Sequence, residues 1–433
     1  MLVAPLHQRH HDREQITPHV GEQVFVTDPL AGLLIRDLGE DAGLGQFFQP
    51  GGRDRVGDAH ATGELVEPGR AVEGLAHSLR AIVDRTGIDP VEIDDVITGV
   101  VSQVGEQSLN LARRALLAAG YPESVPGVSV DCQCGSGQQA IAFAAQGVIA
   151  GTYDAVVAAG VESMSRVPMG SAAVGASDLN GTAFDTRYPD GLVGQGISAE
   201  LITARWNISR TEIDEFSLRS HELAAQATKN GLFDNELAPI AGLTADEGIR
   251  LGSTVESLAG LRPAYYDEAI ARRFPEIDWR ITAASASQIS DGSAAVLVMS
   301  EEKAAELGLR PRARVHTIAV AGDDPLLMLA AIIPATRKVL ARSGLDLDDI
   351  DLFEVNEAFA PVVLAWAQEL GVDLDKVNVN GGAIALGHPL GASGARLATT
   401  GLNALEQRGG RFLLQTMCEA GGLANATIYE RLD

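Results

Sequence analysis

Residues 128–137 read VSVDCQCGSG, and residues 377–394 read VNVNGGAIALGHPLGASG. In both stretches a short aliphatic run typical of a strand leads into a turn, and a Gly- and Ser-rich segment then begins a helix. Aligning the two stretches places Cys134 opposite His388, at an offset of 254 residues. This repetition indicates that the chain contains one structural unit twice.

A second repeated segment has nearly the same spacing. Residues 87–101 and residues 344–358 each combine a glycine that would stop a helix, an acidic turn and a strand. Ile93 corresponds to Ile350, at an offset of 257 residues.

A third pair follows in the same order, because residues 153–162 resemble residues 411–420 and Gly160 falls opposite Cys418, at an offset of 258 residues. Short Val, Ile and Ala runs alternate with helical patterns in both copies, which indicates an α/β architecture. The sequence therefore predicts two similar α/β halves.

Composition and charge narrow the class of protein. The chain has 433 residues, of which 46% are hydrophobic and 21% charged, so it is globular and too long for one small core. The net charge of −25 argues against nucleic acid and membrane as partners. An anionic ligand would need a local positive field.

Cysteine usage and the N-terminus bear on location. Three cysteines cannot form a disulfide framework, which favours a reducing compartment. The N-terminus lacks the apolar stretch of a signal peptide. The longest uncharged run, residues 132–153, contains four glutamines and reads as a buried helix. We therefore expect a cytoplasmic protein.

Cys134 is the first candidate for chemistry, because it lies where a predicted strand meets a predicted helix. The helix dipole is expected to lower the pKa of its thiol from about 8.5 toward neutrality. The glycines that follow leave backbone N–H groups available to an oxyanion. A buried, inert cysteine explains the pattern equally well. Cys132 is interpreted as such a bystander, with a redox pair to Cys134 as the alternative.

His388 lies at the equivalent junction of the second half. If the halves pack about a pseudo-twofold axis, the two junctions face each other, and His388 would activate Cys134 as a nucleophile. Otherwise His388 is an ordinary core or surface histidine. The following Pro389 fits the first position of a helix.

Two more residues end strands. Cys418 follows a strand and precedes a glycine turn, so it is either an acid/base or a buried strand-terminal thiol. Asn356 is either a helix cap or an amide that positions a water or a carbonyl. No ordered metal-ligand spacing occurs, so we expect no metal site.

These residues together resemble the thiolase family of acetyl-CoA acyltransferases. The matching blocks run in family order over residues 71–433: 132-CQCGSG, 160-GVESMSR, 355-VNEAFA, 378-NVNGGAIALGHPLGASG and 417-MCEAGG. The block VDCQCGSGQQA is most similar to actinobacterial thiolases of β-oxidation and of sterol side-chain degradation.

The resemblance implies a thiolase-like duplicated α/β/α/β/α layered fold with two pseudo-twofold-related halves and an inserted loop domain. It implies the following division of the chain: a divergent N-terminal segment (1–70), an N-terminal half (71–165 plus 283–305), the inserted loop domain (166–282) and a C-terminal half (306–433). A long insertion on a rigid scaffold often forms a wall of the binding site.

The resemblance also implies a role for each catalytic residue. Cys134 would carry the acyl group, His388 would activate it and contribute to an oxyanion hole, and Cys418 would exchange a proton with the acetyl carbon. Asn356 would hold a water near the thioester oxygen. Two thiols and an imidazole would thus cleave a 3-ketoacyl-CoA with coenzyme A, or condense in reverse.

Other residues would form the rest of the site. The resemblance implies that Ser287 contacts the pantetheine arm and that Gly160, Glu162 and Ser163 support the cavity floor. Ala420 and Gly421 would contribute to coenzyme A binding. No prosthetic group is implied; coenzyme A is a co-substrate, the partners are 3-ketoacyl-CoA, acetyl-CoA and coenzyme A, and the assembly is a homodimer or homotetramer.

Two departures from the family pattern leave alternatives open. Ala420 stands where many members have glycine, and an alanine there can offer its N–H only if its φ is negative. The Arg-Thr-Pro-x-Gly stretch that follows the first strand is missing, and only residues 23–28 look strand-like in that region. A catalytically weak acyl-CoA-binding protein is therefore the second hypothesis, and a carrier-dependent ketoacyl synthase the third.

Overall fold

A computed structural model describes residues 24–30 and 70–432 of the chain. Its strands form a single nine-stranded sheet in the order β3-β2-β4-β5-β1-β6-β9-β8-β7. The strands are β1 (Val24–Leu30), β2 (Asp95–Gly99), β3 (Gly127–Val130), β4 (Ala155–Ser163), β5 (Asp291–Ser300), β6 (Pro311–Gly322), β7 (Leu352–Val355), β8 (Phe412–Glu419) and β9 (Leu423–Arg431).

The order of the strands reflects the duplication. Counted toward the middle of the sheet, β2, β4, β5 and β1 of the first half correspond to β7, β8, β9 and β6 of the second. Within each half the inner pairs β2–β4 and β7–β8 are parallel, while β5 and β9 run antiparallel to their neighbours. The counterpart of β3 in the second half is reduced to single bridges at Val377 and Val379. The predicted duplicated α/β fold is thus confirmed.

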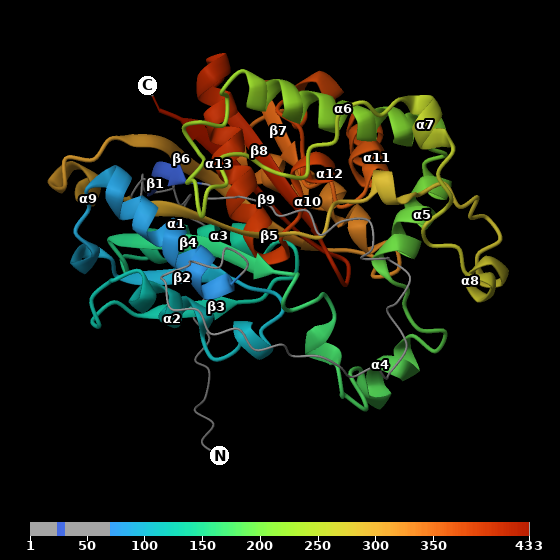
Figure 1. Ribbon diagram of the computed structural model, residues 1–433, viewed down its shortest axis with the longest axis horizontal. Coiled ribbons are helices and arrows are strands. Elements are labelled where there is room, and N and C mark those ends of the chain that lie inside the picture. Colours follow the sequence, from blue (N-terminus) through green and yellow to red (C-terminus); the bar gives the residue numbers. More distant parts are fainter. Residues whose placement is uncertain (1–23, 31–69, 433) are drawn as a thin grey trace, which may run out of the picture.

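Helices cover and separate the two halves of the sheet (Figure 1). The helices of the two halves are α1 (Ala71–Thr86), α2 (Leu111–Ala118), α3 (Ser136–Ile149), α9 (Glu301–Glu306), α10 (Ile332–Ser343), α11 (Ala360–Leu370), α12 (Ala383–Leu386) and α13 (Leu390–Arg408). Side chains of α3 and α13 form one core with inner residues of both halves of the sheet, whereas α1 and α2 share an outer core with the first half and α10 and α11 with the second. The five layers are therefore α1 with α2, the first half of the sheet, α3 with α13, the second half of the sheet, and α10 with α11.

Glycines end the matching helices of the two halves at matching points, as the sequence predicts. Gly87 follows α1 with φ of 71°, and its N–H bonds to the carbonyl oxygen of Val83. Gly344 follows α10 with φ of 73° and bonds to Leu340 in the same way. Glycine adopts this left-handed conformation without strain, so a glycine at this position predicts the end of the helix.

A long excursion separates β4 from β5, although the two strands pair directly with each other. It carries α4 (Gly181–Arg187), α5 (Gln195–Arg205), α6 (Arg210–Lys229), α7 (Val255–Ala259) and α8 (Glu268–Arg273). In Figure 1 these helices lie along one side of the two halves, with α4 and α8 at the periphery. Helix α6 begins with a capping box between Ser209 and Glu212.

The first strand fills the position between the two halves. β1 pairs antiparallel with β5 on one side and with β6 on the other, so the sheet is continuous. The strand-like residues 23–28 therefore overlap β1, and the first half does not lack this strand. The rest of the divergent N-terminal segment lies outside the described residues. No helix among the described residues is long and apolar enough to cross a membrane.

Candidate active site

Cys134 lies in a tight turn between β3 and α3. Its side chain is 3% exposed. The N–H of Gly135 donates to the carbonyl oxygen of Cys132 at 3.1 Å, and the N–H of Ser136 donates to that of Gln133 at 3.0 Å. Gln133 has a φ of 48°, which shows how sharply the chain turns before the helix.

The prediction of a lowered pKa at Cys134 is contradicted by its surroundings. Burial raises the pKa of this thiol above its ordinary value, and the neighbouring Cys418 raises it further. The amides of Gly135 and Ser136 are already committed to the turn, so they do not serve the sulfur. Desolvation of the thiolate therefore outweighs the dipole of α3.

The imidazole of His388 is held in one orientation by Ser393. Its Nδ1 lies 2.6 Å from the Ser393 hydroxyl, and that hydroxyl donates to the carbonyl oxygen of Pro389 at 2.9 Å. Because the hydroxyl hydrogen is used, Nδ1 is the donor and Nε2 is left unprotonated. Burial, helped by the charge of Arg396, lowers the pKa of His388 to about 4, so the ring is neutral.

Asn356 connects the histidine to the second buried thiol. Its Nδ2 lies 3.3 Å from His388 Nε2 and donates to Cys418 Sγ at 3.7 Å. Burial raises the pKa of Cys418 to about 12, although the Asn356 amide acts in the opposite direction. Asn356 Oδ1 is buried and accepts no hydrogen bond from the described residues. Asn356 thus touches both a potential base and a potential acid.

The two junctions meet because glycines let α3, α13 and β4 approach closely. A Cβ at Gly160 would lie 2.1 Å from the carbonyl oxygen of Gly391, and a Cβ at Gly394 would lie 2.1 Å from the backbone nitrogen of Gln138. Helix α13 begins at Leu390 with Pro389 as its N-cap, one residue later than predicted. Cys134 and Leu390 share one small apolar cluster.

The carboxylate of Glu162 links the end of β2 to the start of α13. Its carboxylate accepts the backbone N–H groups of Val101 and Ser102, each at 3.0 Å, and that of Gly391 at 2.9 Å. Ser163 donates its backbone N–H to Gln107 at 2.7 Å. These bonds fix the ends of β2 and β4 against the start of α13.

The residues expected to touch coenzyme A lie near strand ends of the same region. The N–H of Ser287 donates to the carbonyl oxygen of Ala358 at 3.0 Å, beside the segment that carries Asn356. Ala420 follows Cys418 at the end of β8 and adopts a negative φ, while Gly421 has φ of 85°. The backbone condition for an alanine at this position is therefore met.

Cys132 does not pair with Cys134, and all three cysteines are free thiols. Its Sγ donates to Glu419 Oε2 at 3.2 Å, across the boundary between the two halves. Burial raises the pKa of Glu419 to about 7 and, with the Glu419 carboxylate, that of Cys132 to about 12. The hydrogen bond from Cys132 to Glu419 thus links the turn that carries Cys134 to β8.

Sequence reasoning missed two side chains of the site. Ser393 orients His388 and could have been found, since it lies one helical turn into the same Gly-rich block. Gln195, which donates from Nε2 to Cys134 Sγ at 3.9 Å, belongs to α5 in the long excursion. Its local sequence carries no signal of this contact.

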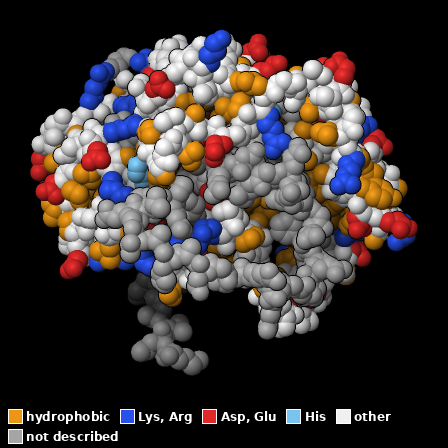
Figure 2. Space-filling model, viewed as in Figure 1, with side chains coloured by type: hydrophobic (Ala, Val, Ile, Leu, Met, Phe, Trp, Pro, Cys, Tyr) orange, Lys and Arg blue, Asp and Glu red, His pale blue; other side chains and the backbone are white. Residues whose placement is uncertain are grey.

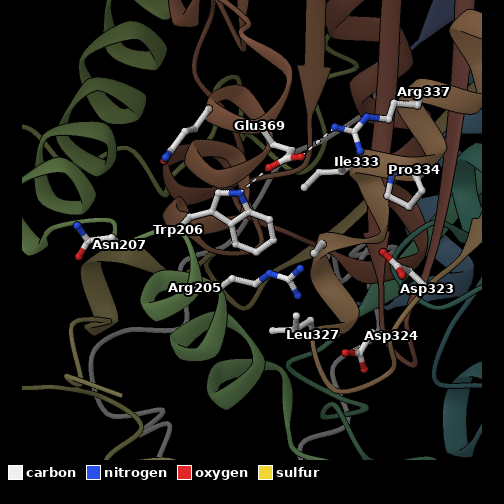
Figure 3. A pocket seen from close by; sticks show the side chains of 12 residues that line it. Arg205, Trp206, Asn207, Asp323, Asp324, Leu327, Ile333, Pro334, Arg337 and Glu369 are labelled. Carbon is white, nitrogen blue, oxygen red and sulfur yellow. Dashed lines mark hydrogen bonds and ion pairs between the residues drawn. The ribbon is translucent and has the colours of Figure 1, made fainter. Parts of the chain in front are cut away.

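A cavity of about 470 Å³ opens at the far end of α5. Figure 3 shows Trp206 and Arg337 converging on the carboxylate of Glu369, which accepts from Trp206 at 3.2 Å and pairs with Arg337 at 2.9 Å. None of the four candidate catalytic residues lines this cavity. In the described part of the chain no cluster of three or more His, Cys, Asp or Glu side chains could hold a metal ion.

Comparisons with known proteins agree over nearly the whole described chain. Residues 60–302 match the family model of the thiolase N-terminal domain, and residues 309–431 match that of the thiolase C-terminal domain. A steroid 3-ketoacyl-CoA thiolase of Mycobacterium tuberculosis is 50% identical over 364 residues, which cover 82% of this chain and 86% of that protein. A 3-ketoacyl-CoA thiolase of Escherichia coli is 42% identical over 376 residues, covering 84% and 94% respectively.

The fold has solved relatives as well. The crystal structure of the acetyl-CoA acetyltransferase of Bacillus anthracis matches with a TM-score of 0.79 and 36% sequence identity. The match covers 95% of this chain and 99% of that one.

Proposed function

Because this chain belongs to the thiolase family, we propose that Cys134 is its nucleophile, His388 its base, Cys418 its second acid/base and Asn356 the amide between them. The enzyme is an acyl-CoA C-acyltransferase that cleaves 3-ketoacyl-CoA with coenzyme A, the reaction for which its relatives are named. The observation that carries the residue assignment is the contact of Asn356 Nδ2 with both His388 Nε2 and Cys418 Sγ.

The first half-reaction uses both thiols. His388 Nε2 accepts the proton of Cys134 while the sulfur attacks the ketone carbon C3 of the substrate. The C2–C3 bond then breaks, and its electron pair remains on C2 of the departing acetyl-CoA. Cys418 gives its proton to this carbanion, which leaves an acyl group on Cys134 and a thiolate on Cys418.

The second half-reaction restores the enzyme. The Cys418 thiolate takes the thiol proton of coenzyme A, whose sulfur attacks the acyl carbon. Cys134 departs as a thiolate and recovers its proton from His388. Two molecules of thioester leave, and no proton is gained or lost overall.

Burial keeps the groups of the site uncharged in the resting enzyme. A neutral imidazole can accept a proton, and the pKa of about 4 keeps His388 neutral at physiological pH. Cys418, with a pKa of about 12, holds its proton until a strong base such as a carbanion forms beside it. Asn356 Oδ1 has no hydrogen-bond partner within residues 24–30 and 70–432, which supports the role of this amide in holding a water close to the thioester oxygen.

Coenzyme A would bind between the excursion and the strand ends. Ser287, Ala420 and Gly421 would face its pantetheine arm, and basic residues of the loop domain 166–282 would meet its phosphates. Figure 2 shows Lys and Arg side chains scattered among acidic ones on the visible face, so a net charge of −25 does not prevent a local positive field. Outside the loop domain, residues 71–165 plus 283–305 would form the N-terminal half, and residues 306–433 the C-terminal half.

We infer a homo-oligomer from the edge of the first half. Strand β3 pairs with β2 alone among the described strands, and Val128 on it is 40% exposed. Phe143 and Ile149 of α3, the next helix along the chain, are also exposed. An open strand edge flanked by apolar side chains is typical of a surface that pairs with a second copy.

The decisive experiment measures thiolysis of 3-ketoacyl-CoA substrates of increasing chain length, including one with a sterol side chain. We expect turnover by the wild-type enzyme and covalent acylation of Cys134, which mass spectrometry locates. Cys134→Ala should abolish both, because it removes the thiol that carries the acyl group in this proposal. Cys132→Ser is the matched control and should retain activity, since its hydroxyl can still donate to Glu419.

Two results would contradict the proposal. An acyl label that persists in Cys134→Ala would move the nucleophile elsewhere. A folded, pure wild-type protein that binds acyl-CoA without turnover would favour the acyl-CoA-binding alternative.

A further inference from the structure

A glutamine of the long excursion between β4 and β5 contacts the sulfur of Cys134, the proposed nucleophile. Gln195 is the first residue of α5, and its Nε2 donates to Cys134 Sγ at 3.9 Å. Sulfur is a large acceptor, so hydrogen bonds to it are longer than those to oxygen. Among the described side chains, only that of Gln195 donates to this sulfur.

The fold fixes the place of Gln195. Glu200, one turn further along α5, is buried and accepts the backbone N–H groups of Arg280 and Ile281 at 3.0 and 2.9 Å. A Cβ at Gly196 would lie 2.3 Å from the ring of Tyr265, so the start of α5 packs directly on this aromatic side chain. These contacts fix the start of α5, from which the Gln195 side chain reaches Cys134.

The Cys134 thiolate has few other sources of stabilisation. Burial opposes its charge, and Cys418 and Glu419 of β8, the titratable groups that act on it electrostatically, both raise its pKa; the Gln195 amide and, to a smaller extent, the backbone N–H of Cys134 lower it. The first two amides after Cys134 are bonded within the turn. In these surroundings a single directed N–H has a large share of the stabilisation.

We propose that Gln195 is a catalytic residue, which donates a hydrogen bond to the Cys134 thiolate as it attacks the ketone and again as it leaves the acyl group. This inference rests on the proposed role of Cys134 as the nucleophile. It gives the loop domain a part in the chemistry, beyond the binding of substrate.

The expected size of the effect follows from two opposing trends. A hydrogen bond to a charged group shifts a pKa by about 1 to 2 pH units. The fraction of thiolate at neutral pH rises about 10- to 100-fold, while its intrinsic nucleophilicity falls with a Brønsted coefficient of about 0.4–0.5. The net gain is about 3- to 10-fold in the attack, and departure of the less basic thiolate is also faster.

The test compares Gln195→Met with Gln195→Glu. Methionine is similar in size but has no N–H, whereas glutamate places a carboxylate beside the sulfur. Glutamate is also favourable at the first position of a helix. Gln226→Met, at an exposed position of α6, is the matched control.

The primary measurement is the rate of alkylation of Cys134 by iodoacetamide at pH 7–9, located by tandem mass spectrometry. We expect a loss of about 3- to 10-fold for Gln195→Met, a larger loss for Gln195→Glu and none for the control. Single-turnover acylation by a 3-ketoacyl-CoA and deacylation by coenzyme A should both slow in the same order.

The outcomes separate this inference from the function on which it rests. If wild-type Cys134 is acylated and Gln195→Met is alkylated and acylated at the wild-type rate, Gln195 has no catalytic role, and the nucleophile assignment stands. If the wild-type enzyme turns over without acylating Cys134, the nucleophile assignment is wrong. The proposed role of Gln195 is then wrong as well, because it depends on that assignment.

Discussion

At the scale of single residues, burial keeps the three titratable groups of the candidate site, Cys134, Cys418 and His388, uncharged at neutral pH. Cys134 and Cys418 have raised pKa values and His388 a lowered one, and burial is the main cause in each case. A buried site of this kind strengthens every directed hydrogen bond within it. In such surroundings the amides of Asn356 and Gln195, rather than charged side chains, donate to the sulfurs of Cys418 and Cys134.

The sequence predicts the two thiols, the imidazole and the amide as site residues, because each lies at a strand end or a Gly-rich helix start with a recognisable pattern. It misjudged the pKa of Cys134, since the degree of burial is a tertiary property that no local pattern records. Gln195 escaped for a related reason: its contact spans 61 residues and depends on how the excursion packs.

Glu419 gives the first pH-dependent prediction. Its pKa in the folded protein is about 7, against an ordinary value of 4.5. The carboxylate therefore destabilises the fold above pH 4.5, by an amount that grows until about pH 7 and reaches about 3 kcal/mol. Glu419→Gln should be more stable than wild type by up to this amount at pH 8 and equal to it near pH 4, as measured by urea unfolding at each pH.

The shape of the pH dependence is the discriminating observation. A difference between Glu419→Gln and wild type that stays constant from pH 4 to 8 would mean that ionisation of Glu419 is not its source.

At the scale of elements, the active site depends on how closely α3 and α13 approach. Both helices were predictable from their glycines and aliphatic runs. The sequence does not reveal that Gly394 and Gly160 are there to permit contact, because a glycine in a helix or strand has several possible reasons. The reduced counterpart of β3 at residues 377–379 was likewise invisible, since its aliphatic pattern is as regular as that of β3 itself.

Gly394→Ala tests this contact. The new Cβ would meet the backbone nitrogen of Gln138 at 2.1 Å, and backbone cannot yield as a flexible side chain can. We expect a loss of about 1–3 kcal/mol in the free energy of unfolding and a large drop in thiolysis, because α13 carries Ser393 and begins two residues after His388. Urea denaturation and the thiolysis rate measure the two effects.

Gly74→Ala in α1 is the matched control. Its Cβ would lie 3.7 Å from Ser293 Oγ, an ordinary contact, so the change should stabilise the helix by about 0.5–1 kcal/mol. If Gly394→Ala kept full stability and activity, close packing of the two helices would not be what brings the junctions together.

At the scale of the whole molecule, the sequence predicts the duplication but not which strand connects the two halves of the sheet. Three repeated blocks predicted two halves, and the strand order bears this out. That β1 would sit between β5 and β6 could not be read from its sequence, because a short aliphatic strand has no mark of its neighbours. Its pairing on both sides makes one sheet out of two.

This position predicts that a backbone change in β1 weakens the whole enzyme. Val26 is paired with Val298 of β5 and with Ala313 of β6. Val26→Pro removes a ladder N–H and places a ring in the middle of a sheet, which costs about 3 kcal/mol or more. Val26→Ala keeps the N–H, and its cost should be about 1 kcal/mol or less. If urea denaturation gave both variants the same stability, β1 would not be the strand that joins the two halves.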